Sequence, residues 1–256
     1  GHWGGAAPVA LTNVPRMRHH GASVCDEFIG CAMRTIIVAN APNLDISPYL
    51  GLIDEAALLI AADGGARALM RQGIYPQIVI GDLDSLTSDD QAILLEHGVE
   101  LQRFPRAKDE TDLELALLEA ARRGAQVIDV VGALGGRWDH TFANGALLAL
   151  PALADRKVRL LDDRQELFVV RDQAEISGKV GDTVSLLPLS VEARGVTTQG
   201  LQYPLHEATL HYEQARGVSN VLLEVPARVT LRSGLLLVVH HDDGGQYQWN
   251  TNPDAA

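Results

Sequence analysis

The sequence predicts an α/β domain with a Rossmann-like, mainly parallel sheet and helices on both faces, followed by a small antiparallel β sandwich or barrel. The first half alternates short apolar runs, typical of buried parallel strands, with helical stretches. After about Leu161, short β-type runs follow one another between Gly, Pro and Asp turns. We therefore expect an irregular extension over residues 1–32, the α/β domain over 33–165, the β domain over 166–242 and a polar tail over 243–256.

Each strand candidate of the α/β part is a short, mostly apolar run. These candidates are Thr35–Ala39, Leu58–Ala62, Ile78–Gly81, Val99–Arg103, Gln126–Val131 and Val158–Leu161. The clearest helix is expected over Asp112–Arg123, because its apolar residues recur at helical spacing and form one stripe. Gly124 follows where a helix end favours positive φ. In the β part the strand candidates are Leu167–Val170, Thr183–Leu189, Val221–Val225, Val229–Leu231 and Leu235–His240.

Composition argues against nucleic acid and membranes as partners. The 256 residues carry a formal net charge of −12, with 21 basic residues against 33 acidic ones, and basic residues cluster only at Arg16–His20. No apolar run approaches the ~18 residues of a membrane span, and residues 1–32 lack the pattern of a signal peptide. Cys25 and Cys31 are expected as free thiols in a reducing cytosol. A cytoplasmic protein is therefore expected.

Aspartates directly follow two of the predicted parallel strands. Asp63 precedes two glycines, Gly64 and Gly65, and Asp82 and Asp84 follow the next strand. Ligands of open α/β sheets bind beyond the carboxyl ends of the strands, so these carboxylates suit a divalent metal and a polyphosphate. In an extended segment, carboxylates at i and i+2 point to one face and can share Mg²⁺. The alternative is an Asp-rich turn in which Asp84 caps a following helix.

A third acidic motif opens the clearest predicted helix. Asp109 as N-cap and Asp112 at N3 would form an acidic version of a capping box, favoured by the helix dipole. Lys108, just ahead of the helix, can hold a phosphate while Asp112 reaches the metal. Capping alone is the structural alternative, and it is compatible with a functional role.

A glycine-rich segment follows the strand Gln126–Val131. Its glycines let the backbone approach a ligand closely, and Arg137 offers a charged fork suited to phosphate. The segment is neither a Walker loop nor a dinucleotide-binding GxGxxG motif, and His140 alone is more typical of a helix start than of a ligand or base. The later run His240–Asp243 is expected to be a strand that ends in a polar turn, because adjacent strand residues point to opposite faces.

Taken together, these motifs resemble the thiamine pyrophosphokinase family. The resemblance spans about Thr35 to His240, with the motifs in the family's order. They are Ala62–Ala66, Gly81–Ser85, Lys108–Asp112, Gly135–His140, Gly195–Leu205 and Val218–Asn220.

The resemblance implies an ATP-binding catalytic α/β domain followed by a thiamine-binding β domain. It also implies a homodimer whose active sites lie between one subunit's α/β domain and its partner's β domain. The reaction would convert ATP and thiamine to AMP and thiamine diphosphate with Mg²⁺ as cofactor. A hydroxyl attacks the β-phosphorus, so positioning and charge neutralisation are the main requirements.

The resemblance also implies roles for individual residues. Asp82, Asp84 and Asp112 would hold Mg²⁺ and form the catalytic set, in which Asp112 or Asp84 could accept the hydroxyl proton. Ser219 and Asn220 would line the thiamine pocket from a strand start, with side chains free to donate and accept. The residues expected around the nucleotide are Asp63, Gly64, Gly65, Lys108, Asp109, Thr111, Arg137, Asp139 and His140.

Other functions remain in competition on the sequence alone. A related enzyme could transfer a diphosphate to another hydroxymethyl compound, such as a pterin. A phosphohydrolase built on Asp-x-Asp is a different class. Such hydrolases usually need a Thr shortly after the second Asp and a buried Lys later in the chain. Ser85 in the Thr position and the lack of a suitable later Lys argue against this class. A non-catalytic nucleotide sensor is the third possibility, and the intact acidic ligands argue against it.

Overall fold

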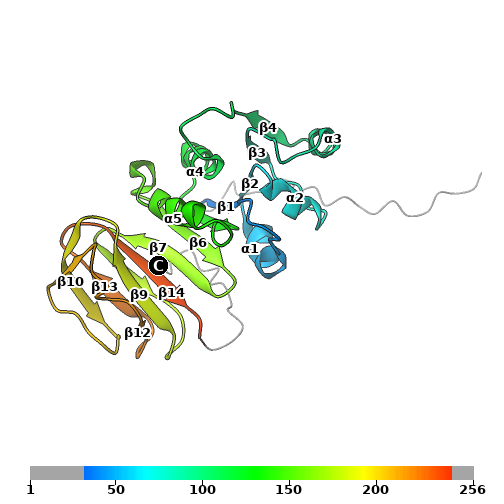
Figure 1. Ribbon diagram of the computed structural model, residues 1–256. Coiled ribbons are helices and arrows are strands. Elements are labelled where there is room, and N and C mark those ends of the chain that lie inside the picture. Colours follow the sequence, from blue (N-terminus) through cyan, green and yellow to red (C-terminus); the bar gives the residue numbers. More distant parts are fainter. Residues whose placement is uncertain (1–31, 244–256) are drawn as a thin grey trace, which may run out of the picture. The chain divides into compact units, whose positions relative to one another are not determined.

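Figure 1 shows the computed structural model, which describes residues 32–243. Its α/β part contains the parallel strands β1 (Arg34–Val38), β2 (Leu58–Ala62), β3 (Ile78–Gly81), β4 (Glu100–Arg103), β5 (Val127–Val131) and β6 (Lys157–Asp162). Every strand predicted here is confirmed, with ends that differ by at most one residue. The predictions for Cys25, Cys31, most of the extension and all but the first residue of the tail lie outside the described residues.

Helices cover both faces of this sheet (Figure 1). They are α1 (Leu50–Glu55), α2 (Gly65–Met70), α3 (Ser88–Glu96), α4 (Asp112–Arg122) and α5 (Trp138–Leu147), with short 3₁₀ turns η1 (Ser47–Tyr49) and η2 (Pro151–Leu153). Ile37, Ile60 and Ile80 pack with the apolar stripe of α4 on one face. Ile36 and Leu59 point the other way and pack with α1 and α2. This alternation follows from the period of two in a strand.

The β part continues the same sheet and adds a second one. Strands β7 (Gln165–Val170), β14 (Leu236–His241), β9 (Thr183–Pro188) and β12 (Asn220–Val221) extend the first sheet beyond β6. The second sheet has the order β11 (Ala208–His211), β10 (Glu192–Gln199), β13 (Ala227–Thr230) and β8 (Gln173–Ile176). Buried residues of both sheets, such as Val184 and Val229, share one core. The predicted sandwich is therefore confirmed.

The complete first sheet has ten strands in the order β12-β9-β14-β7-β6-β5-β1-β2-β3-β4. The predicted domain division after residue 165 falls at the start of β7, within this continuous sheet, and it stays a prediction. Within residues 32–243, no helix is long and apolar enough to cross a membrane.

The sequence patterns of the β part were less informative than those of the α/β part. The strand predicted over Val221–Val225 is wrong, because only Asn220–Val221 pair with β9. The chain then leaves the sheet, and the Leu223 amide bonds to the Gly200 carbonyl in a separate loop. Strands β8, β10 and β11 were not predicted. In β10 the inward residues alternate with polar ones, but Arg194 and Gly195 interrupt the pattern.

Leu117→Ala should lower the free energy of unfolding by about 2–5 kcal/mol, because it removes a fully buried side chain of α4 from the core. Leu95→Ala on α3 is the matched control, since Leu95 is 59% exposed and should change stability by less than about 0.5 kcal/mol. Urea unfolding measures both. Equal losses of unfolding free energy in the two variants would contradict the packing described for α4.

Candidate active site

The strand order reverses at β1, which has β2 on one side and β5 on the other. In open α/β sheets the ligand crevice lies at such a switch point, beyond the carboxyl ends of the strands. The loops after β2 and β5 both pack closely on the end of β1. A Cβ on Gly65 would lie 2.0 Å from the Val38 carbonyl oxygen, and one on Gly132 would lie 2.7 Å from that of Ala39. Glycine is required at both positions by this close approach.

Three aspartates meet beyond the carboxyl ends of β2 and β3, beside this switch point: Asp63, Asp82 and Asp112. One carboxylate oxygen of each lies within 4.8 Å of those of the others. Asp63 follows β2, Asp82 follows β3, and Asp112 begins α4. Asp63 is buried, and its Oδ1 has no hydrogen-bond partner among the described residues. We call these residues the aspartate triad.

Gly81 makes the close approach of the triad possible. A Cβ at this position would lie 3.1 Å from both the Asp112 carboxyl carbon and the Asp63 Cβ, and the backbone has φ +152°. A side chain would therefore push the two aspartates apart. Asp63 itself has φ 44°, an uncommon conformation for a residue other than glycine. Such backbone conformations cluster at functional sites.

Lys108 contacts the triad directly. Its Nζ donates to Asp112 Oδ1 at 2.8 Å, and its side chain is only 13% exposed.

The prediction that Asp109 is the N-cap of α4 was wrong. Thr111 is the N-cap, because its hydroxyl accepts from the Glu114 amide, so Asp112 is the first helical residue and Asp109 lies outside the helix and exposed.

Asp84 does not join the triad. The prediction of an extended segment with Asp82 and Asp84 on one face was wrong, because Leu83 is buried with φ 62° and reverses the chain. The Asp84 amide donates to Asp82 Oδ1 at 3.1 Å, which closes a tight Asx-type turn. The Asp84 side chain is 51% exposed and lies 3.6 Å from Arg106. It does not cap α3 either, since Thr87 does so.

The loop after β5 presents an exposed ion pair at the start of α5. Arg137 donates from Nε and Nη2 to the two carboxylate oxygens of Asp139, at 3.1 and 2.5 Å. These bonds lower the pKa of Asp139 to about 2. The His140 side chain is exposed, and its amide donates to Asp139 Oδ1. The buried Asn144 anchors the loop by donating to the Ala133 carbonyl.

Sequence reasoning missed Asn40, which directly follows β1. Its side chain lies against Gly64, where an added Cβ would be 2.5 Å from the Asn40 carboxamide carbon. Its Nδ2 donates to Ser85 Oγ at 3.4 Å. Asn40 therefore connects the loops after β1, β2 and β3. The available signal was the one used for Asp63, a polar residue at the end of a buried strand.

Ser219 and Asn220 lie at the start of β12, as predicted. Asn220 is buried, and its side chain is not free: Oδ1 accepts from the Tyr203 amide at 2.9 Å, and Nδ2 donates to the Tyr203 carbonyl at 2.8 Å. The prediction of a free Asn220 side chain is therefore wrong. Ser219 is exposed with φ 58°, and its amide donates to Ser185 Oγ.

Two family models match successive parts of the chain. The catalytic domain of thiamin pyrophosphokinase matches residues 49–160, and its vitamin B1 binding domain matches residues 170–236. Together they span more than half of the 256 residues. The chain belongs to the thiamine pyrophosphokinase family. The family predicted from the motifs is therefore confirmed.

Relatives and solved structures agree with this membership. The thiamine pyrophosphokinase of Bacillus subtilis is 29% identical over 214 residues, covering 82% of this chain and all of the relative. Thiamine pyrophosphokinase 1 of Arabidopsis thaliana is 26% identical and covers 84% of this chain and 89% of the relative. The crystal structure of the B. subtilis protein superposes with a TM-score of 0.74 at 27% identity, over 82% of this chain and all of that one. That of the Geobacillus thermodenitrificans protein gives 0.72 at 27% identity, over 84% of this chain and all of that one.

Arg137→Ala should raise the pKa of Asp139 from about 2 toward its ordinary value of 3.8, because hydrogen bonds from Arg137 are the main cause of the lowering. Carboxyl carbon NMR titration measures the shift. Arg194→Ala, which removes another exposed pairing with a carboxylate, should leave Asp139 unchanged. A pKa of Asp139 that stays near 2 in the Arg137 variant would contradict the pairing.

Proposed function

We propose that this chain is a thiamine pyrophosphokinase that transfers the diphosphoryl group of ATP to the hydroxyl of thiamine, giving thiamine diphosphate and AMP. The observation that carries this proposal is the aspartate triad beside Lys108, beyond the ends of β2 and β3 in a sheet whose sequence matches the family's catalytic domain. ATP is the co-substrate that family membership implies. A carboxylate cluster at that position suits a metal that binds polyphosphate.

The residues of the triad fit Mg²⁺. This ion prefers oxygen ligands and is usually held by one or two carboxylates, with waters and substrate phosphates completing the shell. The buried Asp63 Oδ1 without a hydrogen-bond partner is the kind of atom that a cation satisfies. We therefore assign the metal to Asp63, Asp82 and Asp112. When bound, Mg²⁺ would neutralise phosphate charge and polarise the phosphoryl oxygens.

The other residues predicted for the site receive roles according to their distance from the triad. Lys108 points at the triad, so it supplies positive charge to the phosphates. Asp84, predicted as a metal ligand, lies outside the triad. With Asp112 assigned to the metal, we propose Asp84 as the carboxylate that accepts the hydroxyl proton of thiamine. The rest of the proposed nucleotide site consists of Gly64, Gly65, Asp109, Thr111, Arg137, Asp139 and His140.

The sheet order supports active sites shared between two copies of the chain. Strands β9, β14, β7, β6, β5 and β1 lie between β12, which carries Asn220, and β2, which ends at the triad. At about 4.8 Å per strand, the seven spacings from β12 to β2 place these positions roughly 34 Å apart within one chain. If Ser219 and Asn220 serve the thiamine site, a partner subunit must bring them to the triad. We therefore propose a homodimer with composite sites.

The competing functions have less support. Transfer to a pterin would not explain the match to a vitamin B1 binding domain. Hydrolysis or nucleotide sensing would not require that second domain at all. Cytoplasmic location stays a prediction.

A coupled assay with ATP, thiamine and Mg²⁺ should yield AMP and thiamine diphosphate in equal amounts, with neither formed when Mg²⁺ is chelated. Asp63→Asn and Asp82→Asn should each lower kcat by about 10²–10³, because a lost ligand charge weakens metal binding and phosphate neutralisation. Asp89→Asn, an exposed aspartate of α3, is the control. ADP or phosphate formed without thiamine would contradict the proposal, and near-native turnover of the Asp63 variant would contradict the metal assignment.

Mixing Asp82→Asn subunits with Asn220→Ala subunits should restore activity at thiamine concentrations where both parents are poor enzymes. Random exchange in a two-fold dimer makes half of the dimers mixed, each with one intact site, so about a quarter of wild-type activity is expected. Mass spectrometry of the native dimers verifies the exchange, and each parent mixed with itself is the control. No recovery after proven exchange would contradict the composite site.

A further inference from the structure

A row of buried charges crosses the middle of the ten-stranded sheet. It runs through adjacent strands from Arg34 on β1 to Asp129 on β5, Arg159 on β6 and Glu166 on β7. Arg34 Nη1 lies 2.6 Å from Asp129 Oδ2, Arg159 Nε donates to Asp129 Oδ1 at 2.8 Å, and Arg159 Nη1 donates to Glu166 Oε2 at 3.1 Å. None of these residues is more than 7% exposed. The proposed chemistry uses none of them.

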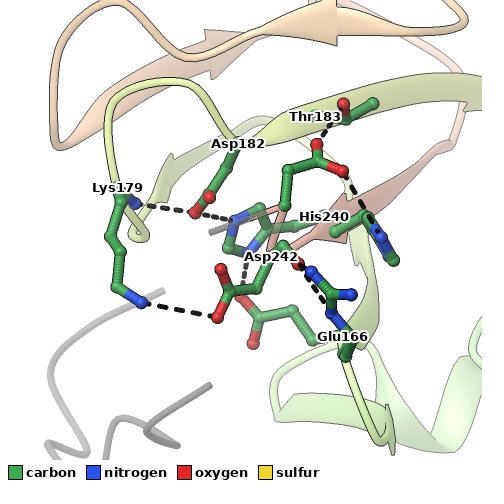
Figure 2. Close-up of polar contacts among 9 residues, drawn as sticks. Glu166, Lys179, Asp182, Thr183, His240 and Asp242 are labelled. Carbon is green, nitrogen blue, oxygen red and sulfur yellow. Dashed lines mark hydrogen bonds and ion pairs between the residues drawn. The ribbon is translucent and has the colours of Figure 1, made fainter. Parts of the chain in front are cut away.

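The row continues at His240 on β14, which lies directly opposite Glu166 and is fully buried (Figure 2). Its Nδ1 is 3.3 Å from Glu166 Oε1, and its Nε2 is 3.0 Å from Asp182 Oδ2. An ionised carboxylate only accepts, so with both carboxylates ionised each ring nitrogen would be a donor and the ring an imidazolium. Burial opposes this charge, but the bonds to Glu166 and Asp182 outweigh it and raise the pKa of His240.

Asp182 connects His240 to a turn over residues 178–182. The same Oδ2 that accepts from His240 also accepts from the Lys179 amide at 2.7 Å (Figure 2). The backbone at Gly178 lies on the ring, since an added Cβ would be 2.6 Å from His240 Nε2. The His240 ring therefore lies beneath this turn, and its Nε2 lies within hydrogen-bond distance of the carboxylate that closes the turn.

The 178–182 turn is hydrogen-bonded to the segment that follows the edge strand β12. The Gly181 amide donates to the Leu222 carbonyl at 2.8 Å, and the Leu222 amide donates to the Asp182 carbonyl at 2.9 Å. Leu222 directly follows β12, where Asn220 pairs with Val184 of β9. The Asn220 side chain then fixes the backbone of Tyr203, as described above. His240 is thus connected to the Ser219–Asn220 edge through one carboxylate and two backbone hydrogen bonds.

We propose that His240 is a positioning residue for thiamine: as an imidazolium between Glu166 and Asp182, it holds the 178–182 turn and thereby the β12 edge in its binding conformation. This inference rests on the proposed function, in which that edge belongs to the vitamin site. When the ring loses its proton, two buried carboxylates face a neutral imidazole, which can donate to only one of them. The turn is then held less firmly.

Among residues 32–243, no cationic side chain other than His240 contacts the Asp182 carboxylate. Lys179 carries its ammonium on the same turn, where it lies 3.4 Å from Asp242 Oδ2 rather than at Asp182. Asp242 is buried on the continuation of β14, and Arg159 reaches Glu166 from β6. Since the His240 pKa is raised in the folded state, the stabilisation is present below the ordinary pKa of 6.5 and is lost as pH rises through the raised value. Thiamine affinity should therefore fall with rising pH in that range.

The test compares His240→Gln and Asp182→Asn with Val238→Ala, a fully buried apolar change two residues away on β14. Val238→Ala matches the loss of stability but leaves the turn contacts in place. Both polar variants should raise the KM for thiamine about fivefold or more, as expected if the competent edge falls to about a fifth of the population. The KM for ATP and kcat should stay within about twofold. In the wild type the thiamine KM should rise with pH, and in His240→Gln that pH dependence should be lost.

Hydrogen exchange gives a readout that does not depend on activity. The quantity compared is the protection factor, the exchange rate corrected for the intrinsic rate at each pH. The protection factors of the amides of residues 181 and 222 should be lower in both polar variants than in Val238→Ala, and lower in the wild type at higher pH. If the wild type exchanges as predicted but makes no thiamine diphosphate, the proposed function fails and the structural link stands. Equal thiamine KM and equal exchange in the polar variants and in Val238→Ala would overturn the inference. If His240→Gln does not fold, Asp182→Asn and the wild-type pH series decide it.

Discussion

Mutual repulsion of three carboxylates is the constraint around which the candidate site is built. Two unit charges 4 Å apart near a protein surface interact by about 4 kcal/mol, and the triad brings its ligand atoms within 4.8 Å. The fold enforces this approach by placing Asp63 and Asp82 directly after parallel strands and Asp112 at a helix start, with Gly81 between them. Lys108 contacts only one of the three carboxylates among the described residues. A bound divalent cation is the counter-charge that such a geometry suits.

One continuous sheet connects the triad to the Asn220 edge, which in the proposed homodimer belong to two different active sites. The triad and the Asn220 edge lie on the same sheet but many strands apart, so within one subunit neither can move freely with respect to the other. The strands between them carry the row of buried charges that runs from Arg34 to His240. Replacing one residue of this row by an uncharged one leaves its partner charged and buried, which is strongly destabilising. The Asn220 edge is therefore held by ionic contacts as well as by apolar packing.

Much of this architecture could be predicted from local patterns, and the errors have physical causes. Buried parallel strands are continuous apolar runs, and all of those predicted were found. The i, i+2 argument for Asp82 and Asp84 assumed an extended chain, which the left-handed Leu83 reverses. Asp63 was assigned to the nucleotide, because sequence cannot show that its carboxylate converges on Asp82. His240 was expected at the end of a strand, but its two carboxylate partners could not be predicted, since they lie 74 and 58 residues away in sequence.

The most direct test of the aspartate triad is anomalous scattering from crystals soaked with Mn²⁺, which takes the oxygen ligands that Mg²⁺ prefers. The account predicts one peak within ~2.0–2.3 Å of carboxylate oxygens of Asp63, Asp82 and Asp112, and its loss in crystals of Asp63→Asn. A peak held by Asp84 without Asp63, or equal occupancy in the Asp63 variant, would contradict it.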